Sequence, residues 1–174
     1  MKKIILLLTI IVSIFIYKET KNNEVIIPDT AIRLRVIPNS NSALDQNMKL
    51  KVKDYLEDNT YNLLKDVNDI DSARKIIKDN IDDIDQNINT IFTTNNYNMD
   101  YNINYGYNYF PTKEYHGIKY REGYYESIVI SIGNAEGDNF WCVLFPNLCL
   151  IDTENTTDVE YKSWALEKIN KILK

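Results

Sequence analysis

The stretch 31-AIRLRVIPNSNSALDQNMKLKVKDYL-56 determines how the fold of this chain begins. Apolar residues alternate with others over 31–37, and this period of two predicts a strand that buries one of its faces. Arg33 and Arg35 occupy the other face of that strand, which we expect to be exposed. Residues 38–42 have the composition of a turn.

A helix is predicted directly after this turn. Ser42 is a suitable N-cap, and Asp45 suits the positive end of the helix dipole in the first turn. The apolar residues at helical spacing are Leu44, Met48, Val52, Tyr55 and Leu56. A second helix is predicted from Asp71 or Ser72, with a stripe formed by Ile77, Ile81, Ile84, Ile88 and Ile91. Such a stripe is typical of a side that faces the core, and a seam for a partner helix is the alternative.

The second half of the chain is predicted to be richer in strands. A period of two over 97–105 indicates a half-buried strand that Gly106 breaks, and 109–120 has the character of an ordered loop with a turn near Gly117. Two further strands and a closing helix follow, at 128–132, at 140–145 and from Asp158 onwards. The strand at 140–145 is apolar on both faces, so we expect it to be central.

This order of elements predicts an α+β fold. We expect an antiparallel-rich small sheet packed by two to three helices, or a small α/β layer if the first strand joins the sheet in parallel. The predicted organisation is a signal peptide or N-terminal membrane anchor at 1–21, a short linker at 22–30 and a single domain at 31–174.

The N-terminus has the pattern of an export signal. Lys2 and Lys3 precede a mostly apolar run at 4–17, which is short for a membrane span. The lysines orient the start of the chain to the cytoplasm and the rest to the outside. No A-x-A site follows the run, so both a cleaved signal and a retained anchor fit, and a buried N-terminal strand is the alternative.

The charge of the exported part limits its partners. Residues 1–21 hold four lysines and one glutamate of the 20 basic and 25 acidic residues, which leaves a net charge of −8 for the rest. A protein this acidic is not expected to bind nucleic acid, because such binding needs basic patches. It is also not expected to adhere electrostatically to an anionic membrane face.

The only two cysteines, Cys142 and Cys149, lie in the apolar run 139-NFWCVLFPNLCLI-151. A structural zinc site usually needs four ligands, and two cysteines with one histidine provide too few. A catalytic thiol needs a base, for which His116 is the sole histidine, but a thiol in the middle of an apolar strand is inert. We therefore expect no metal site and no thiol catalysis.

A hairpin brings the two cysteines together. If Phe145 and Pro146 form a two-residue loop, Cys142 lies opposite Cys149 with their Cα atoms about 4.5–5.5 Å apart. That distance suits a disulfide, and export makes oxidation possible. Two reduced buried thiols are the alternative.

The sequence contains few other residues in a pattern that is typical of catalysis. The chain has no G-x-S-x-G elbow and no phosphate-binding glycine loop. Asp152-Thr153 is followed by glutamate rather than glycine, which departs from the aspartic protease signature. Glu122, Glu126 and Glu136 are typical of solvated glutamates near turns, with acid–base work as the alternative. We predict that the protein is not an enzyme, has no cofactor, and has a binding or signalling role.

Three stretches of the chain resemble the stage II sporulation protein R family of endospore-forming bacteria. They are 33-RLRVIPNSNSALDQNMKLKVKD-54, 110-FPTKEYHG-117 and 132-IGNAEGDNFWCVLFPNLCLID-152, of which the last two are specific. The chain departs mildly from the family pattern at Pro38, Lys53, Phe140 and Asn147, and in 133-GNAEGDN-139, where a glycine is replaced.

The resemblance implies an intercellular signal. Members of the family are made in the forespore and exported into the space between the two sporulating compartments. There they activate a membrane-embedded aspartic protease, the sigma-E factor processing peptidase, which cuts the precursor of the mother-cell sigma factor. The implied role of this chain is therefore that of an activating ligand, located in the intermembrane space of the septum.

Two surfaces are candidates for contact with that protease. Arg33 and Arg35 are suited to acidic or polar groups, with pairing to the protein's own carboxylates as the alternative. The second surface is a loop with Phe110, Thr112, Lys113 and Tyr115, which packed aromatic residues could equally explain.

Two other functions are alternatives. One is a cell-wall binding module in which exposed Tyr107, Tyr109 and Tyr120 stack on sugar rings. The other is a hydrolase, with peptidoglycan as a candidate substrate, that uses His116 or glutamates.

Overall fold

A computed structural model describes residues 9–13, 30–115, 118–146, 167 and 170. Among these, 9–13 are helical and exposed, and no helix is both long and apolar enough to cross a membrane. Most of the predicted signal segment, nearly all of the predicted closing helix, His116 and Cys149 lie outside the described residues. The predictions about them are therefore untested.

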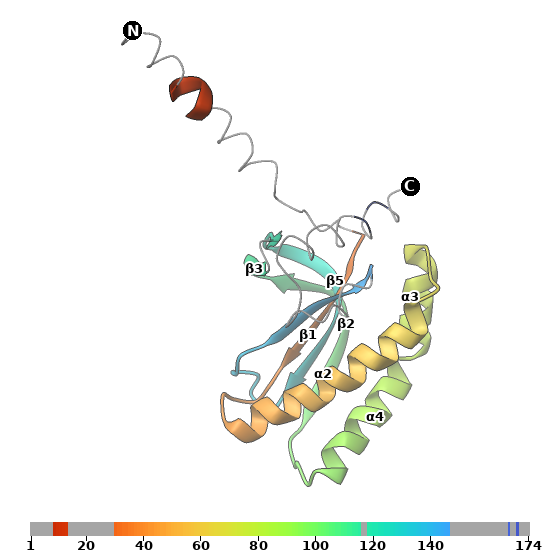
Figure 1. The fold of residues 1–174 in the computed structure, drawn as a ribbon. Helices are drawn as coiled ribbons and strands as arrows, with labels where there is room; N and C mark the ends of the chain where they lie inside the picture. Colours follow the sequence, from red (N-terminus) through yellow and green to blue (C-terminus); the bar gives the residue numbers. More distant parts are fainter. Residues whose placement is uncertain (1–8, 14–29, 116–117, 147–166, 168–169, 171–174) are drawn as a thin grey trace.

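A mixed sheet forms the centre of the described fold (Figure 1). Its 4 strands are β1 (Ile32–Ile37), β2 (Tyr101–Phe110), β5 (Gly123–Ile132) and β6 (Phe140–Phe145), in the order β2-β5-β1-β6. β1 pairs in parallel with β5, whereas the β1–β6 and β2–β5 pairs are antiparallel. The predicted α+β fold with an antiparallel-rich sheet is confirmed. The first strand joins the sheet in parallel, which was the condition set for the alternative of a small α/β layer.

Three helices pack against one face of this sheet: α2 (Ala43–Leu64), α3 (Ile70–Asp79) and α4 (Ile81–Thr94) (Figure 1). Their buried side chains meet Leu34 and Val36 of β1 and Ile128 and Ile130 of β5 in one core. Every second residue of each strand points to this core, which explains why the apolar alternation predicted β1 correctly.

The helices differ from the prediction in two respects. Ser42 does cap α2, because its side chain accepts a hydrogen bond of 3.1 Å from Asp45 N, but Leu44 is 63% exposed rather than buried. The predicted second helix is two helices, with the break at Asn80, whose φ of −110° and ψ of 5° are not helical. The isoleucine stripe continues across the break, so periodicity alone did not reveal it.

The strand predictions need three corrections. β2 begins at Tyr101 and continues through Gly106, which pairs with Ser127. Within the stretch predicted as a loop, the hairpin of β3 (Lys113–Tyr115) and β4 (Ile118–Tyr120) forms. β6 lies at one edge of the described sheet rather than in its centre.

The turn after β1 is held by an unusual carboxylate. Asp45 is only 4% exposed and accepts hydrogen bonds from Ser40 Oγ (2.6 Å), Asn39 Nδ2 (3.0 Å) and Tyr97 Oη (2.6 Å). The hydroxyls of Ser40 and Tyr97 lower the pKa of Asp45 from 3.8 to about 2, against the opposing effect of burial. Asp45 thus ties the turn to Tyr97, three residues after the end of α4.

The same turn contacts the loop between β5 and β6. Asn39 Oδ1 accepts from Asn134 N at 2.9 Å, and the Gly137 N–H donates to Pro38 O at 3.1 Å. A Cβ built on Gly137 would overlap the Ser40 carbonyl, so only glycine fits there. The first and third family stretches quoted above are therefore neighbours in space. Asn39 and Pro38 of the first and Asn134 and Gly137 of the third stabilise the fold.

Candidate functional site

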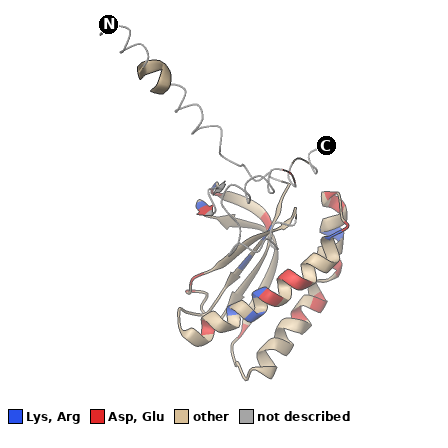
Figure 2. Ribbon diagram, in the orientation of Figure 1, with Lys and Arg blue, Asp and Glu red and all other residues tan. Residues whose placement is uncertain are grey.

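The face of the sheet opposite the helices carries the residues that the sequence marked as candidate contacts. Side chains alternate along β1, so Leu34 joins the helix-covered core while Arg33 and Arg35 point to the other side. Figure 2 shows acidic and basic residues along the helices, and basic colour on β1 within the sheet.

Arg33 is buried, which corrects the expectation that it is exposed. It is 3% exposed, and its guanidinium carbon lies 3.3 Å from the ring centroid of Tyr125. Phe110 and Tyr120 lie around it at 5.4 and 5.8 Å. Aromatic rings attract a cation through their negative faces, so Arg33 organises the aromatic side chains rather than offering its charge to a partner.

Arg35 is half-buried and keeps an accessible side. Its guanidinium carbon lies 4.4 Å from the ring centroid of Trp141, and burial lowers the pKa of Arg35 below its ordinary value. With the Asn139 amide oriented to satisfy its neighbours, its oxygen accepts from Arg35 Nη2 (2.7 Å) and Nε (3.1 Å). An arginine nevertheless stays protonated in proteins, so this charge is permanent.

Trp141 links the two candidate surfaces. The half-buried indole lies between Arg35 and Lys113, whose ammonium nitrogen is 5.5 Å from the ring centroid. Phe110 packs edge-on against Trp141, with centroids 5.1 Å apart. We call the set the arginine–aromatic face; its members are Arg33, Arg35, Phe110, Lys113, Tyr120, Tyr125 and Trp141.

The structure brings together four of the six predicted contact residues: Arg33, Arg35, Phe110 and Lys113. Thr112 is exposed beside Lys113, and the side chain of Tyr115 lies outside what the structure describes. Sequence reasoning missed Trp141, Tyr120 and Tyr125 as members of the face. Trp141 pairs with Arg35 across β1 and β6, and no signal in the sequence indicated this, because the run 140–145 is apolar on both faces.

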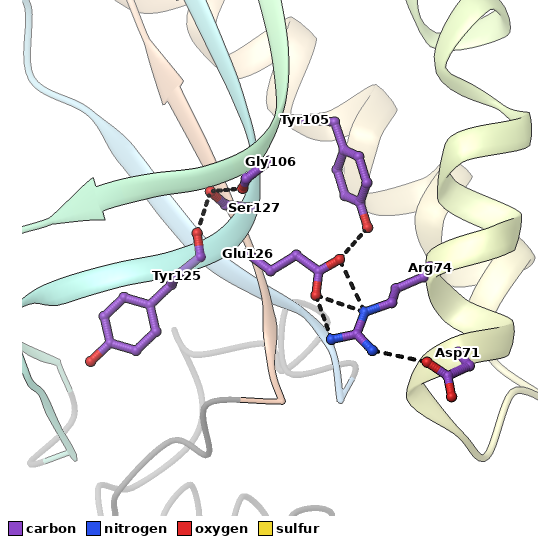
Figure 3. A network of polar contacts seen from close by, with 7 residues as sticks. All are labelled: Asp71, Arg74, Tyr105, Gly106, Tyr125, Glu126 and Ser127. Atoms are coloured by element: carbon purple, nitrogen blue, oxygen red, sulfur yellow. Dashed lines mark hydrogen bonds and ion pairs between the residues drawn. The ribbon is translucent and has the colours of Figure 1, made fainter.

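A second polar network lies on the helix side of the sheet (Figure 3). Glu126 is 6% exposed and accepts from Arg74 Nε (2.8 Å) and from Tyr105 Oη (2.6 Å), and Arg74 Nη2 forms an ion pair of 2.8 Å with it. Arg74 also binds the exposed Asp71, and the hydrogen bonds that Arg74 donates to Glu126 and, in smaller part, to Asp71 raise the pKa of Arg74. This carboxylate is held by α3, which corrects the expectation of a solvated glutamate.

The cysteine prediction is half outside the described structure. Cys142 lies on β6 opposite Leu34 and packs against the helix-side core. Its predicted partner, Cys149, is not among the described residues, so the pairing stays a prediction. Within the described ranges, no group of three His, Cys, Asp or Glu residues is placed to hold a metal ion.

Comparison with known proteins identifies a family whose matched region includes this face. The model of the stage II sporulation protein R family matches residues 28–155, a range that contains the whole arginine–aromatic face. The chain belongs to this family. It is 35% identical over 159 residues to the stage II sporulation protein R of Bacillus subtilis (strain 168), which covers 90% of this chain and 71% of that protein. Membership of the stage II sporulation protein R family gives the chain a role in sporulation. No solved structure gives a significant match.

Proposed function

We propose that this chain is a forespore-made, exported ligand that activates the membrane-embedded aspartic protease processing the sigma-E precursor. The ligand acts on the outer side of that protease and catalyses no reaction itself. Membership of the stage II sporulation protein R family supports this role. The N-terminal order of two lysines and an apolar run supports export.

The arginine–aromatic face is the observation that carries the proposal. It offers a half-buried tryptophan between the charges of Arg35 and Lys113, and tryptophan and arginine are the residue types that dominate binding energy at interfaces. Lys49 of α2 lies close enough for the charge of Lys113 to act on it: burial and, in smaller part, Lys113 lower the pKa of Lys49, while Asp138 opposes them. We propose that the surface around Trp141, Arg35, Lys113 and Lys49 contacts an acidic or polar outer segment of the protease.

Arg33 has a different part in this proposal. Because it is buried under Tyr125 and beside Phe110, it positions the aromatic rings and does not itself touch the partner. Replacing Arg33 is therefore expected to disturb the fold of the face, so loss of signalling in such a variant would not identify a contact.

The predicted disulfide belongs to the same proposal. Cys142 and Cys149 would close a hairpin at the end of β6, the strand that carries Trp141. Outside the cell thiols are readily oxidised, and a disulfide at this position would limit the motion of β6. It would have a structural part, with no role in catalysis.

The test uses a non-sporulating bacterium that expresses this chain, the protease and its sigma precursor. We expect the pair Lys113→Ala and Trp141→Ala to reduce cleavage strongly, since loss of one interface hot spot costs about 2 kcal/mol or more, which is about 30-fold in affinity. Tyr124→Ala is the matched control, because Tyr124 is 71% exposed and lies outside the face. Equal amounts of exported protein must be verified. Undiminished cleavage by the double variant would show that the face is not the contact.

Cell-wall binding is a second candidate, favoured by the exposure of Tyr107 (68%) and Tyr109 (49%). Tyr120, the third tyrosine expected to stack on sugars, lies 5.8 Å from the Arg33 guanidinium and is only partly exposed. Co-sedimentation of the chain with peptidoglycan, lost on replacing both exposed tyrosines by alanine, would support this alternative.

A further inference from the structure

β2 forms the other edge of the sheet, opposite β6. In the order β2-β5-β1-β6, one side of β2 pairs with β5, and no described strand pairs with its other side. The strand is 10 residues long, YNINYGYNYF. An edge strand exposes a row of backbone N–H and C=O groups that can pair with another chain.

Among the described residues, β2 itself carries none of the usual protections of an edge strand. Natural edge strands are blocked by lysine, proline, inward-pointing charges or a bulge. No charged residue lies between Asp100 and Lys113, although charged residues make up 26% of the chain. The pairing of β2 with β5 is continuous over its whole length, without a bulge. An uncharged edge in a protein of net negative charge is one place where two copies can meet without repulsion.

The direction of the backbone groups follows from the end of the ladder. Asp100 O accepts a hydrogen bond of 2.8 Å from Gly133 N, so residue 100 directs its backbone groups to β5. These groups alternate in direction along an antiparallel edge strand. The even-numbered residues of β2 therefore face β5, and the odd-numbered residues direct their N–H and C=O groups to the free edge.

The sequence of this edge is self-complementary. Residues 104-NYGYN-108 read the same in both directions around Gly106. We propose that two copies of this chain pair through β2 in antiparallel orientation, with Gly106 on the two-fold axis. Tyr105 then lies opposite Tyr107 of the second copy, and Asn104 opposite Asn108 of the second copy. A two-fold interface uses the same surface twice, and in this register the palindrome places tyrosine opposite tyrosine and asparagine opposite asparagine.

The pairing would cover side chains that are now exposed. Tyr107 and Tyr109, at 68% and 49% exposure, would meet Tyr105 and Ile103 of the second copy on the same face. All four are odd-numbered, so these are hydrogen-bonded pairs. Each such pair exchanges two bonds, which gives about eight backbone hydrogen bonds across the interface.

The orientation of the dimer has a consequence for the arginine–aromatic face. The two-fold axis of an antiparallel strand pair is perpendicular to the sheet, so both helix layers lie on one side of the extended sheet. Both arginine–aromatic faces then lie on the other side and point the same way. A contact with the protease at two sites would raise the avidity of this chain for the protease. This consequence, unlike the pairing itself, rests on the proposed function.

Disulfide trapping of the full, exported chain tests the pairing. Gly106→Cys is the principal variant, because a Cβ at this position meets only Asn104 Oδ1, at 3.7 Å. The two introduced cysteines would have Cα atoms about 4.5 Å apart, as in a pair without mutual hydrogen bonds, and this suits a disulfide. We expect a covalent dimer on a non-reducing immunoblot that disappears on reduction.

Two controls fix the interpretation. The unsubstituted chain reports any cross-linking through Cys142 and Cys149. Asn102→Cys is on the same face of the same strand, but its counterpart in the second copy lies about 27 Å away, eight residues at about 3.4 Å each. A monomer from Gly106→Cys, or equal dimer from Asn102→Cys, would overturn the proposal, as would trapping of a different protein in place of a second copy.

A second pair of variants keeps the glycine in place. Chains with Asn104→Cys and Asn108→Cys, carrying different tags, are co-expressed, and we expect a mixed dimer because these positions are opposite in the proposed register. Each variant alone should stay monomeric, since its own counterpart lies about 14 Å away, four residues at about 3.4 Å each. Absence of the mixed dimer would refute the register. Neither experiment depends on sigma-factor processing, so its failure is distinguishable from failure of the proposed function.

Discussion

Replacing Asp45 by asparagine keeps the size of a buried side chain and removes its charge. The carboxylate accepts from Ser40, Asn39 and Tyr97, and an amide has only one oxygen with which to accept these hydrogen bonds. The pKa of Asp45 falls from 3.8 to about 2 in the folded protein. At about 1.4 kcal/mol per pKa unit, this difference corresponds to about 2 kcal/mol of folding free energy.

The sign of the pH dependence follows from the lowered pKa. The folded state holds the ionised form more strongly than the unfolded state does, so the stabilisation is complete above the unfolded pKa of 3.8 and is lost as pH falls towards 2. The difference in unfolding free energy between the native chain and Asp45→Asn should therefore be about 2 kcal/mol at pH 7 and shrink as pH falls from about 5 to 2.

Guanidinium chloride unfolding at several pH values measures this difference. Asp82→Asn, at an exposed position in the first turn of α4, is the matched control and should change stability little at any pH. If Asp45→Asn is as stable as the native chain at neutral pH, or if its deficit is independent of pH, the reasoning about the turn is wrong.

Two further substitutions test other parts of the fold. Arg74→Met leaves buried Glu126 without its ion-pair partner and should lower the free energy of unfolding by about 2 kcal/mol in the same assay. Lys75→Met removes an exposed ion pair on the same helix and should change stability little, so equal losses would contradict the account. Gly137→Ala places a methyl group against the Ser40 carbonyl and should lower the free energy of unfolding by about 1–3 kcal/mol; a stable Gly137 variant would show that the two loops are not in close contact. Gly106→Ala has room for the methyl group and should leave stability unchanged or slightly raised, because glycine weakens a strand interior relative to alanine.

Periodicity was sufficient for the elements that bury one side. The alternation of β1 and the capping serine of α2 both predicted local structure correctly, because apolar periodicity and satisfaction of the helix N-terminus are local constraints, although β1 is buried on both faces rather than on one. The break at Asn80 was not predictable in this way, since the apolar spacing is the same on both sides of it. Gly106 was misread for a similar reason: strand pairing with Ser127 overrides the weak preference of a single glycine.

The candidate site was harder to predict because its parts come from distant strands. The sequence singled out Arg33, Arg35, Phe110 and Lys113 one surface at a time, and could not show that β6 places Trp141 between them. Nor could it show that Arg33 is buried. An arginine on a polar strand face is normally solvated, and here the rings of Tyr125, Phe110 and Tyr120 replace the water.

The most direct test of the central claim is reconstitution of precursor cleavage in a non-sporulating bacterium. The chain, the membrane-embedded protease and the sigma-E precursor are expressed together, and cleavage is followed by immunoblot with and without residues 1–21 of this chain. An activating ligand that works from outside predicts cleavage only when the chain is present and carries its N-terminal segment. Cleavage that proceeds equally without that segment, or no cleavage when all three proteins are present and the chain is exported, would contradict the claim.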